Sequence, residues 1–269
     1  MSGPSADGVP CFPGKYTVEA LCDPAEHAAF IRSRYPGAGL SHTAGIVLLY
    51  QSSLARTALC HGGVRPLGRW VSADLHLTRD DVVLCSGFGR GAPAAGLIVE
   101  QLIALGAPAV VTIGTAATLT GGLAPGDLVV CREALRDEGL SRHYLPPARY
   151  TSPDGPLTAR LTSEISALGF NARTGRTWTT DALYRETAAE VHQYAAEGVL
   201  MADMEAAGVL AVARYRQVPA AAAFAIADSL AQRTPRTDSP RTGMGLSALL
   251  DAATRTLIGT ATGTVWCAR

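Results

Sequence analysis

The sequence has no excess of charge of either sign, only one lysine and no long hydrophobic run. Acidic and basic residues number 23 each, and Lys15 is the sole lysine, so arginine supplies the other positive side chains. A balanced charge argues against a nucleic-acid polymer as a partner, because proteins that bind one usually carry a basic patch. The longest apolar runs, at 45–50 and 218–227, are shorter than the roughly 18 residues that a membrane helix needs. With 48% hydrophobic residues, the chain is expected to form a globular core.

The six cysteines include no Cys-x-x-Cys pair, so the sequence does not support a tetrahedral zinc site, and we expect no bound metal. Cys85 and Cys131 lie in apolar runs and are predicted to be buried thiols. The first 15 residues lack the apolar core of a signal peptide. We therefore expect a cytoplasmic protein with reduced thiols.

Short apolar runs alternate with segments of helical periodicity along most of the chain. The runs predicted as strands are 46–50, 82–86, 109–113, 127–131 and 220–227, and the predicted helices are 94–105, 156–168, 188–197, 204–216 and 247–258. This alternation predicts an α/β fold, a three-layer α/β/α sandwich with a mixed central β-sheet. No linker or internal repeat divides it, so we expect an N-terminal extension over 1–40 and a single domain over 41–269.

Polar groups stand at the ends of several predicted strands, where open α/β folds place ligands. They are the glycine-rich loop 87–93, the Gly114-Thr115 pair, and the carboxylates Glu205 and Asp228. Burying a carboxylate is costly without a partner. A ligand is one reason for such a placement. The alternatives are that Asp203 or Glu205 caps a helix, and that Asp228 caps the segment after it.

Six motifs in one order carry a family resemblance: GRGAP at 89–93, VTIGT at 111–115, RDEGLSRHY at 136–144, TTDALY at 179–184, ADMEAA at 202–207 and IAD at 226–228. Together they resemble the nucleoside phosphorylase superfamily, which contains purine nucleoside phosphorylases, uridine phosphorylases and methylthioadenosine/adenosylhomocysteine nucleosidases. The resemblance covers residues 44–260 and implies a nucleoside phosphorylase-like fold.

The resemblance also implies roles for the residues that match those motifs. Glu205 is expected to accept hydrogen bonds from the ribose hydroxyls, with Met204 packed on the sugar. Thr115 is expected near both the anion and the ribose. The base pocket is expected to include Tyr184, Leu183 and Asp228.

Two further roles concern catalysis. Asp228 is expected to protonate the leaving base, and Arg241 to hold that acid in position. A proton donor at the base and an anion beneath the sugar would stabilise the charges that develop as the N-glycosidic bond breaks.

The sequence departs from the family where phosphate binds. Thr112 occupies the position of a family arginine, and no Gly-Asp-Pro follows the first strand, where Arg56 is the nearest guanidinium. A hydroxyl cannot replace a bidentate guanidinium. We hypothesise that Arg90, with Gly89 and Thr115, supplies a relocated anion site; the alternative is an Arg90 that points to solvent.

These observations favour an enzyme that cleaves or forms the N-glycosidic bond of a purine-type nucleoside. Thr187 and Ala189 stand where uridine enzymes carry glutamine and arginine, which disfavours uracil. Inorganic phosphate is expected as co-substrate, with no other cofactor. The alternatives are a nucleosidase that uses water and a catalytically altered nucleoside-binding protein. By resemblance, the partners are a small-molecule nucleoside and further copies of the chain, in a homodimer or a hexamer built from dimers.

Overall fold

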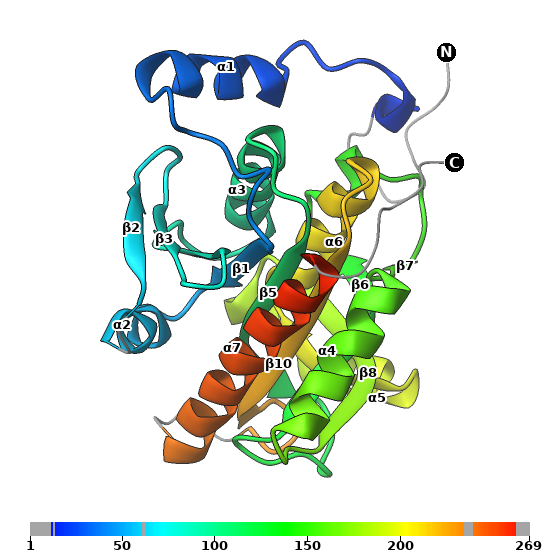
Figure 1. The fold of residues 1–269 in the computed structure, drawn as a ribbon. Helices are drawn as coiled ribbons and strands as arrows, with labels where there is room; N and C mark the ends of the chain where they lie inside the picture. The colour runs from blue at the N-terminus through cyan, green and yellow to red at the C-terminus, as the bar shows by residue number, and fades with distance from the viewer. Residues whose placement is uncertain (1–11, 13, 61–62, 234–238, 262–269) are drawn as a thin grey trace.

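A mixed β-sheet with helices on both faces forms the centre of the computed structural model, which describes residues 12, 14–60, 63–233 and 239–261 (Figure 1). The strands are β1 (Gly45–Leu49), β2 (Arg65–Gly68), β3 (Asp74–Leu77), β4 (Val82–Ser86), β5 (Val110–Thr118), β6 (Leu128–Asp137), β7 (Tyr150–Thr151), β8 (Ala172–Thr180), β9 (Val199–Asp203) and β10 (Ala220–Ser229). The α-helices are α1 (Pro24–Arg34), α2 (Ser52–Cys60), α3 (Ala92–Ala104), α4 (Gly155–Ala167), α5 (Ala188–Ala196), α6 (Ala206–Tyr215) and α7 (Pro240–Ala261). Single 3₁₀ turns are η1 (Lys15–Thr17), η2 (Ser141–His143) and η3 (Leu183–Arg185). The predicted three-layer α/β/α fold is confirmed.

Part of the sheet closes on itself. β5 pairs with β10, β10 with β6, β6 with β8, β8 with β9, and β9 pairs back with β5. From β5 the sheet also continues through β1, β4 and β3 to β2, which forms an open edge. The ring therefore places β9 and β10, which are far from β5 in the sequence, next to the C-terminal part of β5.

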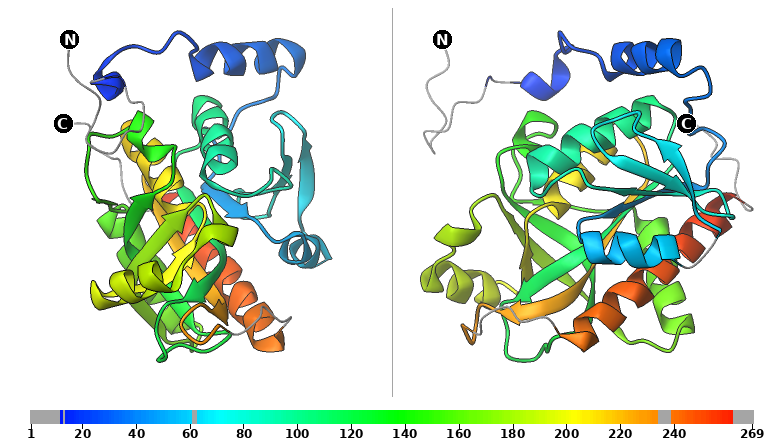
Figure 2. Two further views of the ribbon diagram at one scale, coloured as in Figure 1. Left: turned by 180° about the vertical axis from the view of Figure 1, so that it is seen from behind. Right: turned by 90° about the vertical axis from the view of Figure 1, so that its left-hand side faces the viewer.

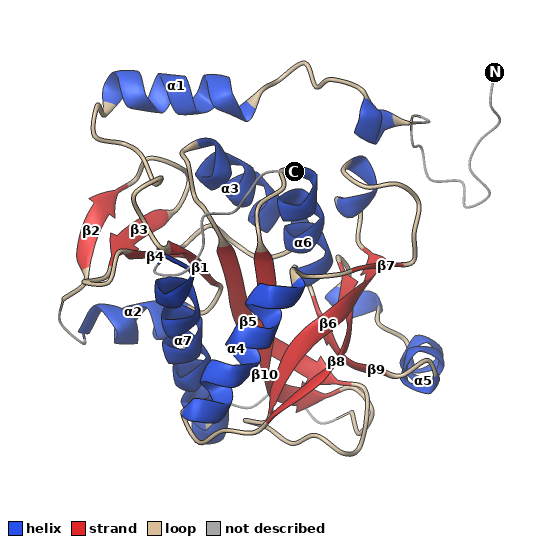
Figure 3. Cartoon of the chain, turned by 45° about the vertical axis from the view of Figure 1, so that its right-hand side comes forward, coloured by secondary structure: helices blue, strands red, loops and turns tan. Residues whose placement is uncertain are grey.

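Two hydrophobic cores lie on the two faces of the sheet. In β1, Ile46 and Leu48 face a core shared with α1, α3 and α6, whereas Val47 and Leu49 face a core shared with α2, α4 and α7. Figure 3 shows α4 and α7 side by side over the second face, and Figure 2 shows α1 lying outside α3. Strands buried on both faces read as continuous apolar runs, which is why β1 and β4 were predicted nearly residue for residue.

Several elements were not predicted, and their sequences explain why. β8 contains three buried threonines and two arginines instead of an apolar run, and β9 has only five residues. β2 is mostly exposed. Within 1–40, α1 buries Ala28 and Ile31 against the first core.

The cysteine prediction is confirmed where it can be examined. Cys85 and Cys131 are buried free thiols, and Cys22 and Cys60 are exposed and free, while Cys11 and Cys267 lie outside the described residues. No helix in the described ranges has the length and apolarity to cross a membrane.

Glycine allows α3 and α6 to cross closely. A Cβ placed at Gly208 of α6 would lie 2.7 Å from the Cβ of Ala92 and 3.2 Å from its Cα, at the first residue of α3. A Cβ at Gly96 of α3 would collide with the side chain of Leu140. This contact fixes the starts of both helices relative to each other, and both starts belong to the pocket described below.

We predict that Gly208→Ala lowers the free energy of unfolding by about 1–3 kcal/mol, because the new methyl overpacks against the backbone of Ala92. Gly243→Ala is the matched control, since that helical position in α7 has nothing within 4 Å of its Cβ. The control should be neutral or stabilising by up to about 1 kcal/mol. Urea unfolding measures both variants, and equal stabilities would contradict the close crossing.

Candidate functional site

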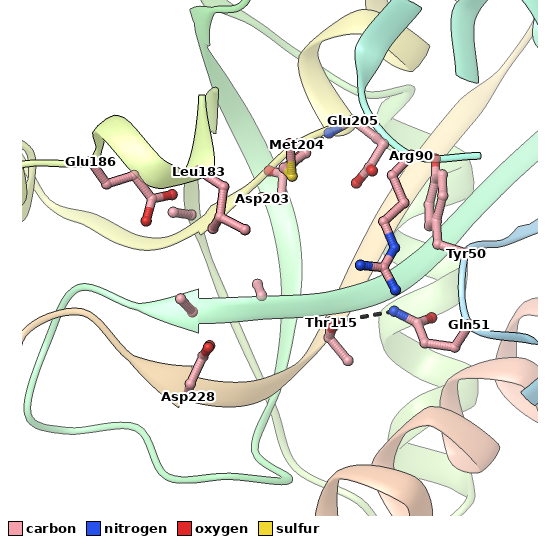
Figure 4. Close-up of a pocket in the computed structure, with 13 residues that line it drawn as sticks. Tyr50, Gln51, Arg90, Thr115, Leu183, Glu186, Asp203, Met204, Glu205 and Asp228 are labelled. Atoms are coloured by element: carbon pink, nitrogen blue, oxygen red, sulfur yellow. Dashed lines mark hydrogen bonds between the residues drawn. The ribbon is translucent and has the colours of Figure 1, made fainter. Parts of the chain in front are cut away.

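A pocket of about 640 Å³, including its open mouth, lies just after the end of β1 and along the C-terminal parts of β5, β9 and β10 (Figure 4). It brings together most of the residues that the sequence singled out. Its lining consists of Tyr50, Gln51, Arg90, Thr115, Ala116, Ala117, Leu183, Glu186, Ala202, Asp203, Met204, Glu205 and Asp228. The described residues include no cluster of three His, Cys, Asp or Glu side chains that could hold a metal ion.

Glu205 occupies the N-cap position of α6, yet its side chain does not cap that helix. Instead Oε1 accepts a hydrogen bond of 2.8 Å from the backbone N–H of Gly91, at the start of α3. The residue is 7% exposed. Burial, followed by the charge of Asp203, raises the pKa of Glu205 to about 7, against the opposing effect of the Gly91 hydrogen bond. Near neutral pH this carboxyl group therefore exchanges between its charged and neutral forms.

Asp203 performs the capping that the sequence offered as an alternative. Its Oδ1 accepts from the backbone N–H groups of Glu205 and Ala206, each at 2.7 Å. Its carboxylate also accepts from the hydroxyls of Thr177 and Thr179 in β8. Asp203 is thus a structural residue that holds the start of α6 against the sheet, leaving Glu205 to face the pocket.

Arg90, Gln51 and Thr115 form a second part of the lining. The guanidinium of Arg90 points toward Thr115 and Gln51 rather than away from the pocket (Figure 4). Gln51 donates from Nε2 to the hydroxyl of Thr115 at 3.1 Å. Arg90 carries the positive charge among the thirteen lining residues, which also include four carboxylates. An anion that enters the pocket would find its favourable potential at this side.

Tyr50 also lines the pocket, and it contacts Thr112, which does not. The hydroxyls of Tyr50 and Thr112 are 2.7 Å apart, and Thr112 is completely buried. The Tyr50 ring packs edge-on against Phe88 with centroids 5.4 Å apart. Burial raises the pKa of Tyr50 well above its usual value, so the pair is neutral. Thr112, which the resemblance aligns with a family arginine, is therefore part of an uncharged hydrogen-bonded pair.

Leu183, Glu186 and Asp228 line the opposite side of the pocket. The pKa of Glu186 is raised to about 7 by burial and by the charge of Asp228. The sequence did not single out Glu186, because it follows a 3₁₀ turn and precedes the Thr187–Glu190 capping box of α5, where an acidic residue is ordinary. Gln51 was missed for a similar reason, since it lies in the short segment between β1 and α2.

Three of the predicted site residues do not line this pocket. Tyr184 is 94% exposed, and Gly89 is exposed in the loop before α3. Arg241 is exposed in the first turn of α7, where its backbone lies against Gly126. Arg56, on α2, is also exposed and outside the lining. The roles of Tyr184, Gly89 and Arg241 stay predictions.

The amino-acid sequence of this chain is similar to those of known proteins. A family model described as the phosphorylase superfamily matches residues 72–255. A guanosine phosphorylase of Halorubrum lacusprofundi is 30% identical over 142 residues, covering 53% of this chain and 58% of that protein. A DeoD-type purine nucleoside phosphorylase of Exiguobacterium sibiricum is 27% identical over 155 residues, covering 55% of this chain and 64% of that protein. The chain thus spans somewhat more than half the length of these two relatives.

Two solved structures share the fold at low identity. An AMP nucleosidase from Bacteroides thetaiotaomicron superposes with a TM-score of 0.71 at 22% identity, covering 88% of this chain and 100% of that chain. A purine nucleoside phosphorylase from Toxoplasma gondii, in complex with immucillin-H, superposes with a TM-score of 0.73 at 19% identity, covering 82% and 93% respectively. The family match extends from the segment before β3 into α7 and includes more than half of the chain. The protein is therefore a member of the phosphorylase superfamily.

Proposed function

We propose that the protein cleaves, or in reverse forms, the N-glycosidic bond of a purine-type nucleoside, with inorganic phosphate as the second substrate. The observation that supports this most directly is the arrangement of one pocket. Glu205 and Met204 lie between a side that carries Arg90 and a side that carries Glu186 and Asp228 (Figure 4). Bond cleavage at a sugar needs these three functions in this order: a group for the nucleophile, a group for the sugar and an acid for the base.

In the proposed reaction a phosphate oxygen, held at Arg90 and Thr115, forms a bond to C1′ of the sugar. The bond from C1′ to the base nitrogen breaks, and its electron pair goes to the base. Asp228 gives the base a proton, so that the products are the neutral base and a sugar 1-phosphate. Glu205 accepts hydrogen bonds from the ribose hydroxyls, which holds C1′ between the two reacting groups.

The two carboxyl groups on the base side act together. Because the pKa of Glu186 is raised to about 7, this side of the pocket retains a proton for part of the time near neutral pH. A protonated carboxyl group can donate to a ring nitrogen of the leaving base, which suits a purine. We propose, from the resemblance, that Tyr184 helps wall the nucleoside site, that Arg241 holds Asp228 in position, and that the enzyme works as a homodimer or a hexamer of dimers without a further cofactor.

Hydrolysis by water is the second candidate. The observation that favours it is the neutral Tyr50–Thr112 pair at the family's arginine position, since phosphate then depends on a single guanidinium. A nucleoside-binding protein without catalysis is a third candidate, and the same experiment separates all three.

We predict that the protein releases the free base from purine nucleosides faster than from uridine, and that release requires phosphate. A panel of nucleosides incubated with and without phosphate, followed by chromatography of base and sugar 1-phosphate, measures this. Base release that is independent of phosphate would establish hydrolysis. An absence of release from every nucleoside would favour the binding protein.

A bell-shaped pH dependence of kcat/KM with its maximum near pH 7 is expected. Below about pH 7, Glu205 becomes protonated and loses an acceptor for the ribose hydroxyls, so activity falls. Above about pH 7, Glu186 loses its proton and the base side can no longer supply one, so activity also falls. The pH profile of kcat/KM for the best nucleoside of the panel measures both limbs.

Glu205→Gln should remove the acidic limb and lower kcat/KM by about 10- to 100-fold, since a hydrogen bond to a charged group contributes roughly 1.5–3 kcal/mol. Glu26→Gln, at an exposed position of α1, is the control and should keep both limbs. A Glu205→Gln profile that still bends near pH 7 on the acidic side would exclude Glu205 as the titrating group.

Arg90→Ala is predicted to raise KM for phosphate by at least about 10-fold, because a charge-assisted hydrogen bond to the anion is lost. The KM for the nucleoside should change much less. Arg255→Ala, on the exposed side of α7, serves as the control. If Arg90→Ala kept both its activity and its phosphate requirement, Arg90 would not bind the phosphate and would be only a solvent-exposed side chain.

A further inference from the structure

Gln51 is the first side chain after Tyr50 at the end of β1, and it belongs to the pocket lining. Its Nε2 donates to the hydroxyl of Thr115 at 3.1 Å. Its Oε1 is buried and has no hydrogen-bond partner within the part of the chain that the structure describes. Buried polar atoms are nearly always satisfied in folded proteins, so a buried amide oxygen beside a pocket is available to accept a hydrogen bond from a ligand.

The surroundings of Gln51 narrow the chemistry of that ligand. The Arg90 guanidinium points to the same place, and Tyr50, which shares a hydrogen bond with Thr112, lies beside Arg90 (Figure 4). Of the four lining carboxylates, Glu186 and Asp228 lie on the opposite side of the pocket, whereas the charge of Glu205, at the start of α6, acts on both Arg90 and Tyr50. A small ligand here therefore meets one positive charge, one amide and the uncharged Tyr50 hydroxyl, with the Glu205 carboxyl group nearby.

An amide beside a guanidinium suits a partly protonated oxyanion. The amide nitrogen carries two hydrogens, of which one is donated to Thr115, and its oxygen is an acceptor. Hydrogen phosphate offers charged oxygens for the guanidinium and the N–H group, and a hydroxyl for the amide oxygen. A half-turn of the amide group exchanges the positions of its donor and its acceptor. The side chain can therefore pair with either a charged oxygen or the hydroxyl of hydrogen phosphate.

We propose that Gln51 binds the attacking phosphate by hydrogen bonds together with Arg90, which carries the positive charge that Thr112 does not provide. The proposal rests on the proposed function, because it assigns the nucleophile's subsite in the same pocket. Gln51 would then help to select the nucleophile. Its uncharged amide can accept a hydrogen bond from the phosphate hydroxyl without repelling the anion, whereas a carboxylate at the same position would repel the anion.

The test is a calorimetric titration with inorganic phosphate of the wild-type protein and of Gln51→Ala, Gln51→Glu and Gln101→Ala. Gln101, on α3, is the matched control, because its Oε1 is also buried and unpartnered but it lies outside the pocket lining. We expect Kd for phosphate to rise at least 10-fold in Gln51→Ala and further in Gln51→Glu, and to stay within twofold in Gln101→Ala. The Kd for the nucleoside, titrated without phosphate, and the melting temperature should stay close to wild type in all three variants.

Equal phosphate affinities in wild type and Gln51→Ala would overturn the proposal, as would a parallel loss of nucleoside affinity and melting temperature, which a structural role produces. Wild-type protein that binds phosphate through Gln51 but releases no base would sustain the subsite and overturn the proposed function. Wild-type protein that binds no phosphate would overturn both. Gln51→Glu also separates charge from packing, since its side chain matches glutamine in size.

Discussion

The hydrogen bond from the backbone of Gly91 to the carboxylate of Glu205 joins the starts of α3 and α6, and the site depends on it. Asp203 holds the α6 side through its cap, and Gly208 allows α3 to approach closely enough for the bond to form. Arg90 immediately precedes Gly91, so the same bond sets where its guanidinium can reach. A displacement of either helix would therefore move the sugar contact and the anion contact together.

The pocket separates charge over a short span. Arg90 provides its positive charge on one side, while Glu186 and Asp228 share electrostatic repulsion on the other. Repulsion and burial keep the base side partly protonated, which an acid catalyst needs at neutral pH. The same negative surroundings make a strongly bound dianion unfavourable except beside the guanidinium. Selectivity between phosphate and water as the nucleophile then depends on a small number of groups on that side.

Sequence reasoning predicted most of the strands that helices cover on both faces, and most of the helices that follow them. Strands buried on both faces are continuous apolar runs, and amphipathic helices keep a helical spacing of apolar residues, so both patterns are visible in the sequence. It missed β8, since Thr177 and Thr179 are buried there for their hydrogen bonds to Asp203 and leave no apolar pattern. Motif resemblance located Glu205, Thr115 and Asp228, which lie at the start of α6, within β5 and near the end of β10, and share one pocket. Glu186 and Gln51 lie in connecting segments, where neither periodicity nor a motif distinguishes a pocket residue from an exposed one.

The closed ring of β5, β10, β6, β8 and β9 also bears on solubility. A chain with balanced charge has little long-range repulsion between its copies, so unpaired strand edges are a hazard for aggregation. In the described part of the chain, ring closure leaves β2 and the two-residue β7 as the edges. β2 carries Pro66, which has no N–H to donate, next to the charged Arg65, and both are exposed. The same ring closure that brings the pocket residues together thus also reduces the number of unpaired strand edges to which a strand of another molecule could add.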